Sequence, residues 1–193
     1  MTMRTDCVPL SAGPKWTFYP RVIPKWTLHL DVISIMNELL KPSQSCLDLV
    51  KESEGLRLFP YKDAKGKLTI GYGHLIKPGE HFEEITEEEA EELLKRDLAS
   101  AETAVKDLVQ VELSQNQFDA LTCFLFNVSP NIFDGSRTLA MLNAGNYEAV
   151  SERLPLYNGV VVMRKDGTTY KRVLPGLVKR RAREVELWER ADS

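Results

Sequence analysis

The sequence lacks the features that define several large classes of proteins. Its 193 residues include only three cysteines, Cys7, Cys46 and Cys123, and no two of them have the spacing of a metal or redox motif. An odd number of widely spaced cysteines gives no closed disulfide framework, so we expect reduced thiols. The most apolar stretch, from Leu28 to Leu40, is interrupted by polar side chains and is too short to span a bilayer, so we expect no membrane insertion.

A targeting segment and a strong charge bias are also missing. The first residues lack the basic flank, apolar run and small-residue cleavage site of a secretory signal, so we expect the protein to accumulate in the cytoplasm. The net charge of −3 does not indicate a nucleic-acid partner. With 43% hydrophobic residues the chain can bury a sizeable core, and its length fits one domain plus an extension.

Residues 1–44 differ in composition from the rest. They contain five of the ten prolines, and the sequence Pro-Lys-Trp-Thr occurs twice, at 14–17 and at 24–27. The aromatic and β-branched residues after each proline favour two short extended segments. We therefore predict an N-terminal extension over 1–44 and a main domain over 45–193.

The main domain begins with a short helix and a small sheet. Leu47, Val50 and Glu54 recur at helical spacing and Gly55 follows, which predicts a helix that ends at a glycine. Residues 56–76 alternate in polarity and contain turn glycines, which predicts a small antiparallel sheet with a turn at 63–66.

The rest of the domain is predicted to be mostly helical. Thr86 with Glu89, and Ser114 with Gln117, are capping-box pairs that mark the starts of two helices. The predicted elements are a long helix over 86–108, a buried helix over 118–128, shorter helices near 136–144 and 146–157, a hairpin over 159–174 and a last helix over 177–190. This order predicts an α+β fold with a small sheet-containing lobe and a helical lobe, joined by a long helix and separated by a cleft.

Glu54 and Asp63 are placed to act as a pair of carboxyl groups. Glu54 ends an apolar helix face, where burial favours a protonated carboxyl group, and Asp63 lies in a turn, where water favours the ionised form. Cleavage of a glycosidic bond needs one group of each kind. Since the chain has 28 acidic residues, the pair alone is weak support, and solvated surface acids are the ordinary explanation.

The spacing of these residues is much more specific. The pattern Glu54-x8-Asp63-x5-Thr69, followed by Ile-Gly-Tyr-Gly-His at 70–74, closely resembles the active-site signature of the phage-type lysozyme (endolysin) family, glycoside hydrolase family 24. The resemblance continues through the capping box to Leu-Pro-Gly-Leu at 174–177 and the two arginines at 180–181, and covers about residues 46–190. It implies a two-lobed, lysozyme-like fold.

The resemblance also implies a reaction and roles for its residues. Glu54 would be the general acid, Asp63 the base or electrostatic stabiliser, and Thr69 would position the attacking water. The reaction would be hydrolysis, with inversion, of the β-1,4 bond between N-acetylmuramic acid and N-acetylglucosamine in peptidoglycan, without metal or cofactor. Without the motif, Thr69 would be interpreted as an ordinary strand threonine.

Five further residues take roles from the same resemblance. His74 and Asp97 would form a structural pair. Leu75, Phe126 and Ser136 match sugar-binding positions, although each has an ordinary alternative as a core leucine, a core phenylalanine and a helix N-cap.

Two regions are left with open interpretations. Between Arg164 and Arg183 the chain has eight basic residues and one acid, which could hold the anionic cell wall, bind nucleic acid without a known motif, or form a solvated basic face. Residues 1–44 could be a wall-binding arm whose tryptophans stack on sugars, a passive β arm, or a non-native or unfolded start. The hairpin at 159–174 could narrow one end of the cleft.

The resulting functional prediction is an endolysin for host cell lysis. Its partners would be peptidoglycan glycan strands, without nucleic acid; it would be a monomer and would stay in the host cytoplasm until a holin releases it to the wall. The alternatives are a lytic transglycosylase, which needs only the acid, and a non-catalytic wall-binding or phage structural protein on a lysozyme scaffold. The complete set of Glu54, Asp63 and Thr69 favours the hydrolase.

Overall fold

The computed structural model describes residue 33 and residues 35–63 and 66–191. The Pro-Lys-Trp-Thr repeat and Cys7, and the predictions made for them, lie outside the described residues. The helices are α2 Gln44–Glu54, α3 Glu87–Leu108, α4 Gln115–Asn127, α5 Pro130–Phe133, α6 Arg137–Asn143, α7 Glu148–Arg153, the 3-10 turn η1 Leu154–Leu156, and α8 Pro175–Glu189. The strands are β1 Arg57–Lys62, β2 Leu68–Gly71, β3 His74–Leu75, β4 Gly159–Met163 and β5 Thr169–Val173.

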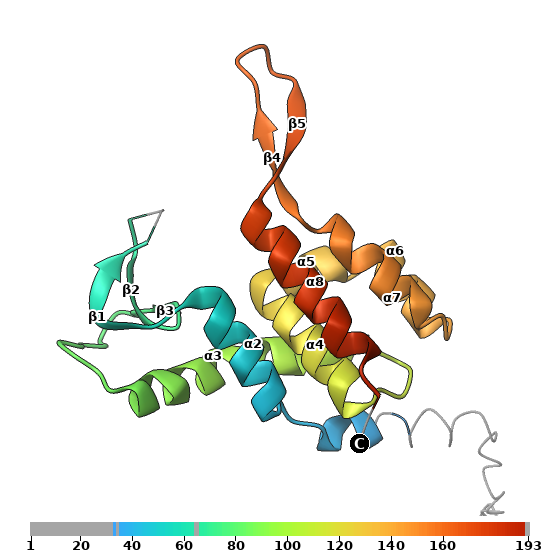
Figure 1. Ribbon diagram of the computed structural model, residues 1–193, viewed down its shortest axis with the longest axis horizontal. Helices are drawn as coiled ribbons and strands as arrows, with labels where there is room; N and C mark the ends of the chain where they lie inside the picture. The colour runs from blue at the N-terminus through green and yellow to red at the C-terminus, as the bar shows by residue number, and fades with distance from the viewer. Residues whose placement is uncertain (1–32, 34, 64–65, 192–193) are drawn as a thin grey trace, which may run out of the picture.

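These elements form the two lobes that the sequence predicts, which confirms the α+β fold. Figure 1 shows the sheet of β1, β2 and β3 at one side of the molecule and the helices α4 to α8 at the other. The long helix α3 runs from below the sheet, past α2, to α4, and α2 lies between the sheet and the helices. None of the helices in the described ranges has the length and apolar character needed to cross a membrane.

Both predicted capping boxes are present. The Thr86 hydroxyl accepts from the Glu89 N–H at 3.2 Å, and the Glu89 carboxylate accepts from the Thr86 N–H at 2.8 Å. Ser114 and Gln117 exchange the same two bonds at the start of α4. Each box satisfies N–H groups that have no partner within the helix, so these two starts were readable from sequence.

Two helix boundaries differ from the prediction because of proline. The helix predicted over 146–157 is divided into α7 and η1, since Pro155 has no N–H to continue the α-helical pattern. The last helix begins at Pro175, two residues before the predicted start at 177. Proline suits the first turn of a helix because its missing N–H would be unpaired there in any case.

The sheet approaches α3 closely because of one glycine. β1, β2 and β3 pair antiparallel in that order, and Gly71 ends β2 with φ of +64°. A Cβ atom built on Gly71 would lie 3.3 Å from the Ala90 Cβ of α3. Gly71 therefore combines a left-handed backbone conformation with a close approach to α3.

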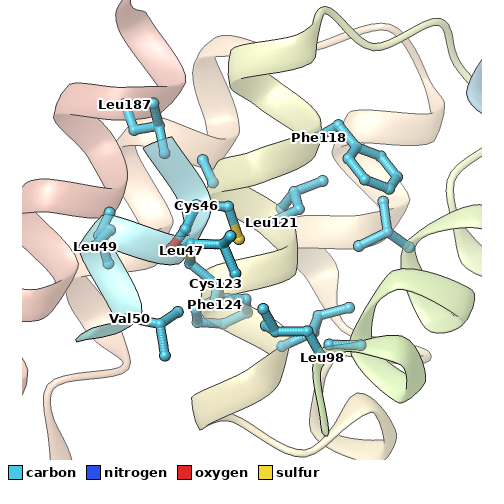
Figure 2. Close-up of a cluster of buried hydrophobic side chains, with 14 of the residues drawn as sticks. Cys46, Leu47, Leu49, Val50, Leu98, Phe118, Leu121, Cys123, Phe124 and Leu187 are labelled. Carbon is cyan, nitrogen blue, oxygen red and sulfur yellow. The ribbon is translucent and has the colours of Figure 1, made fainter. Parts of the chain in front are cut away.

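The core is centred on α4, which is buried on nearly every side, as predicted. Helices α2, α3 and α8 pack around it, and Figure 2 shows residues of α2 and α4 meeting in this core. The Cys46 and Cys123 side chains are fully buried, and their sulfur atoms lie 3.1 Å apart as free thiols. Cys46 therefore packs in α2 as a small hydrophobic side chain would.

The described residues before α2 are attached to the α3–α4 region. Asn37 is 2% exposed; its amide donates to the Val111 carbonyl at 2.8 Å and accepts from the Leu113 N–H at 3.1 Å. The Lys41 ammonium lies 2.6 Å from the Glu102 carboxylate. The chain therefore packs on the helical lobe from at least residue 37, which is earlier than the change in composition near residue 44.

The predicted hairpin is present as β4 and β5, in register from Gly159 opposite Val173 to Met163 opposite Thr169. Its turn contains Asp166 and Gly167 as expected, and the Gly167 N–H donates to the Arg164 carbonyl at 3.0 Å. Figure 1 shows the hairpin projecting away from the helices, directly before α8.

Candidate active site

Glu54 is the last residue of α2. Gly55 follows with φ of +73°, and its N–H donates to the Lys51 carbonyl, which ends the helix as the sequence predicts. The Glu54 side chain is 28% exposed. A Cβ atom built on Gly73 would lie 3.7 Å from Glu54 Oε2, so the backbone of the β2–β3 turn comes close to this carboxyl group. Glu54 therefore lies where α2 meets the sheet.

Arg180 of α8 binds the other oxygen of this carboxyl group. Its Nη1 donates to Glu54 Oε1 at 2.5 Å, and its Nη2 donates to the Cys123 carbonyl at 3.3 Å. The sequence reasoning expected apolar surroundings for Glu54 and did not place a guanidinium there. A signal was available, because Leu177, Arg180, Arg181, Glu184 and Leu187 recur at the helical spacing of a buried face.

This contact corrects the description of the basic stretch from Arg164 to Arg183. Arg180 is 5% exposed, and Arg181 is fully buried with its guanidinium 2.7 Å from the Glu184 carboxylate. Both pair with carboxylates and do not belong to an exposed basic face. The cations of the stretch that do lie on the surface are Arg164, Lys165, Lys171, Arg172, Lys179 and Arg183.

Asp63 lies in a turn directly after β1, as predicted. Its carboxylate Oδ1 accepts from the Lys67 N–H at 2.8 Å, and its own N–H donates to the Lys67 carbonyl at 2.9 Å. The Gly66 N–H donates to the Asp63 carbonyl, which closes the predicted turn. The residue is half-buried, so its carboxylate keeps access to water while the turn fixes its backbone.

Thr69 and Leu75 lie side by side on the sheet. Thr69 in β2 pairs with Tyr61 on one side and with Leu75 on the other. It is 4% exposed, and its hydroxyl donates to the Lys67 carbonyl at 3.2 Å. Leu75 is 41% exposed, so its side chain can contact a bound molecule.

His74 is buried between two carboxylates. Its Nδ1 lies 2.8 Å from Asp97 Oδ2, and its Nε2 lies 3.0 Å from Glu80 Oε2. The Lys77 N–H also donates to Glu80, and this bond, followed by the contact with His74, lowers the pKa of the Glu80 carboxyl group. The sequence reasoning named Asp97 but missed Glu80, which sits in a loop without a periodic pattern.

Phe126 and Ser136 lie on the helical lobe. Phe126, near the end of α4, is half-buried and packs against the core. Ser136 is the N-cap of α6, and its hydroxyl accepts from the Leu139 N–H at 3.1 Å. The ordinary N-cap explanation therefore applies to Ser136, and a sugar contact would be an additional role.

An open pocket of ≈ 710 Å³ lies beside Glu54, where α2, α4 and α8 meet. Its lining residues are Glu52, Ser53, Glu54, Asn127, Leu174, Gly176, Leu177, Lys179, Arg180 and Arg183. A second pocket, of ≈ 780 Å³, lies between residues 81–85 and the first turns of α3 and contains neither Glu54 nor Asp63. Within 33, 35–63 and 66–191, no three His, Cys, Asp or Glu side chains form a group that could hold a metal ion.

The chain is similar to known proteins over most of its length. The sequence model of the phage lysozyme family matches residues 51–184, which contain Glu54, Asp63, Thr69 and Arg180. The chain belongs to the phage lysozyme family. The endolysin of Salmonella phage P22 is 40% identical over 123 residues, 62% of this chain and 84% of that protein. The endolysin of Acyrthosiphon pisum secondary endosymbiont phage 1 is 36% identical over 151 residues, 77% of this chain and 98% of that protein.

Solved structures give the same result. The muramidase domain of SpmX from Asticaccaulis excentricus superposes with a TM-score of 0.69 at 34% identity, over 79% of this chain and 99% of that one. The endolysin from Escherichia coli O157:H7 phage FAHEc1 also superposes with a TM-score of 0.69, at 32% identity, over 78% of this chain and 94% of that one. The predicted lysozyme-like fold and enzyme class are confirmed: the chain is a lysozyme-type hydrolase with an endolysin function.

Proposed function

We propose that Glu54, Asp63 and Thr69 together hydrolyse the β-1,4 bond between N-acetylmuramic acid and N-acetylglucosamine in peptidoglycan. The observation that carries the proposal is the position of Glu54, on the wall of an open pocket and against the turn of the sheet that holds the other two residues. Asp63 does not line this pocket, so a glycan strand would extend from the pocket across the sheet to have Glu54 on one side and Asp63 on the other.

Glu54 would act as the general acid through Oε2. Oε1 is occupied by the Arg180 guanidinium, whereas Oε2 lies toward Gly73 and the sheet. A proton on Oε2 would pass to the glycosidic oxygen as the bond to the anomeric carbon breaks. The absence of a side chain on Gly73 leaves room for the sugar beside this oxygen.

Asp63 and Thr69 would handle the water that completes the reaction. Thr69 donates its hydroxyl proton to the Lys67 carbonyl, so its oxygen lone pairs remain to accept from a water molecule. That water would add to the anomeric carbon and pass a proton to Asp63. Attack from the face opposite the acid inverts the configuration, which is the outcome implied by the family resemblance.

Leu75 is the best supported of the three proposed sugar-binding residues. It is exposed and pairs directly with Thr69, so a sugar held near Thr69 would cover it. Phe126 and Ser136 would contact sugar units on the helical lobe. The hydrophobic side chains of Leu75 and Phe126 and the hydroxyl group of Ser136 suit the alternating apolar and polar surface of a glycan.

Digestion of purified peptidoglycan tests the assignment. The wild type, Glu54→Gln and the control Asp48→Asn, an exposed acid on the same helix, are compared by mass spectrometry of the released muropeptides. Reducing N-acetylmuramic acid ends from the wild type and the control, but not from Glu54→Gln, are expected. Anhydro ends would make the enzyme a lytic transglycosylase and remove the role of Asp63, and an unchanged Glu54→Gln would remove the role of Glu54.

The cellular part of the proposal is that the enzyme works as a monomer and reaches the wall when a holin opens the inner membrane, with 45–193 as the catalytic domain and 1–44 as an extension. Its support is the endolysin family, whose members act on the cell wall. Turbidity of Escherichia coli that expresses the chain, with and without a co-expressed holin, tests the dependence. Lysis without a holin would refute it, and light scattering of the purified protein measures the oligomeric state.

A further inference from the structure

Three charged side chains are buried in the protein directly behind Glu54. Arg180 is 5% exposed, and Arg181 and Glu184 are fully buried. Removing a charge from water costs several kcal/mol, and attraction within a buried group only partly compensates that cost. A buried charge cluster of this kind therefore stands out from the rest of the core and calls for an explanation beyond packing.

One oxygen of Glu184 holds both arginines. Oε1 accepts from Arg181 Nη2 at 2.7 Å and from Arg180 Nε at 3.3 Å. Arg181 Nη2 also donates to the Asn127 amide oxygen at 3.0 Å, and its guanidinium carbon lies 4.8 Å from the centre of the Phe124 ring. The cluster is thus anchored to α4 at several points.

Arg180 is fixed in three directions. Its Nε donates to Glu184, its Nη2 donates to the Cys123 carbonyl, and its Nη1 donates to Glu54. A guanidinium is planar and rigid, so three partners around it set the position and tilt of the whole group. Two of these partners, Glu184 and the Cys123 carbonyl, lie in the core and fix the guanidinium. The guanidinium in turn fixes the position of the Glu54 carboxyl group.

We propose that Glu184 is a positioning residue for the hydrolysis: it holds Arg180 in the plane that orients the Glu54 carboxyl group toward the glycosidic oxygen. The inference rests on the proposed role of Glu54. Glu184 does not touch the pocket, and it acts only through Arg180.

The cluster is poorly explained by stability alone. Arg181 Nε, Arg181 Nη1 and Glu184 Oε2 are buried and have no hydrogen-bond partner among the described residues. Unpaired buried polar atoms destabilise a fold, and apolar side chains of similar size would pack α8 on α4 at lower cost. What apolar side chains would not provide is a fixed guanidinium beside Glu54.

The test measures kcat and KM separately on soluble peptidoglycan fragments, with thermal unfolding recorded for every variant. The variants are Glu184→Gln, Glu184→Asp, Arg180→Gln, the double variant of Glu184→Gln with Arg180→Gln, and Glu54→Gln. Glu186→Gln is the matched control, because Glu186 is an exposed glutamate two positions along the same helix.

Glu184→Gln is expected to lower kcat by about 10- to 100-fold and to change KM by less than about threefold, since misorientation affects the reacting geometry rather than the grip on the glycan. Glu184→Asp, which keeps the charge, should recover part of the loss. In the Arg180→Gln background, Glu184→Gln should cause no further loss of kcat, because the two residues act in series.

The results separate the two proposals. A wild type that is active, a Glu54→Gln variant that is inactive and a folded Glu184→Gln variant with the kcat of Glu186→Gln would overturn the positioning role alone. Independent, multiplicative losses in the double variant would also overturn it. An active Glu54→Gln variant would overturn the proposed function and the inference with it. If Glu184→Gln does not fold, Glu184→Asp takes its place, and an unchanged kcat then counts against the proposal.

Discussion

His74 Nδ1 lies 2.8 Å from Asp97 Oδ2, which ties β3 of the sheet to the middle of α3. The histidine is 2% exposed and its second nitrogen contacts Glu80, so both polar atoms of the ring are satisfied inside the small lobe. The carboxylates lie on opposite sides of the ring and leave it no position from which to reach a glycan. The geometry suits a brace between the sheet and α3.

Replacing Asp97 with alanine should therefore reduce stability rather than catalysis. Loss of a charge-assisted hydrogen bond to a buried ring should lower the free energy of unfolding by about 1–3 kcal/mol, with kcat per folded molecule within about threefold of the wild type. Denaturant unfolding and initial rates measure the two quantities. Asp107→Ala, an exposed acid on the same helix, is the control, and equal stability of the two variants would contradict the brace.

The two buried thiols should be almost inert in the folded protein. Burial raises the pKa of the Cys123 thiol well above its usual range, and the hydrogen bond to Cys46 adds to the effect. Because the thiolate is the reactive form, a Cys7→Ser variant should react with a thiol reagent only slowly when native and at both sites once unfolded. Rapid native reaction would show that α2 separates from α4 in solution.

Glu184 makes stability depend on pH in an unusual direction. Burial raises its pKa to about 7 against the opposing effect of Arg181 and Arg180, whereas the ordinary pKa of a glutamate in an unfolded chain is 4.5. Between these values the folded state holds more protons than the unfolded state, so the contribution of Glu184 to stability falls as the pH rises from 4.5 to about 7.

The wild type should therefore lose stability relative to Glu184→Gln as the pH is raised over this window, and the difference should level off above pH 8. Urea unfolding of both proteins at a series of pH values measures it. A difference that stays constant, or that increases with pH, would show that the two arginines outweigh burial at this site.

The site could be predicted from sequence only where its residues are close along the chain. Glu54, Asp63, Thr69 and His74 fall within 21 positions and have a specific spacing, so the sheet and its turn could be predicted from the sequence. Arg180 reaches Glu54 from 126 positions away. Its helical spacing indicates a buried face, but that pattern does not say which residue the face meets. Its partner in the core becomes visible only when α8 is packed on α4.

Composition alone also does not show where the folded part of the chain begins. Residues 35–43 follow the proline-rich segment in sequence, yet Asn37, Lys41 and Ser43 bond to the helical lobe. A chain that begins at residue 35 should therefore have a free energy of unfolding about 2–4 kcal/mol higher than a chain that begins at residue 43. The shorter chain lacks Asn37 and leaves the Leu113 N–H and the Val111 carbonyl unpaired.

Both truncations keep Ser43, which caps α2, so the helix start is the same in each. Thermal and denaturant unfolding of the two purified proteins measure the difference, and Asn37→Ala in the full chain isolates the contribution of that residue. Equal stability would place the structural boundary at 44, where the composition changes.

Thr69 allows the sharpest test of the proposed water site, because serine and valine separate its hydroxyl from its shape. Thr69→Ser keeps the hydroxyl and should retain kcat within about tenfold, whereas Thr69→Val keeps the volume and should lose about 10²- to 10³-fold, the usual cost of one missing polar contact in a transition state. KM should change little in either, since the hydroxyl binds water and not the glycan. Both substitutions leave the strand pairing with Tyr61 and Leu75 intact. A valine variant with the kcat of the serine variant would return Thr69 to the role of an ordinary strand residue and leave Asp63 to hold the water alone.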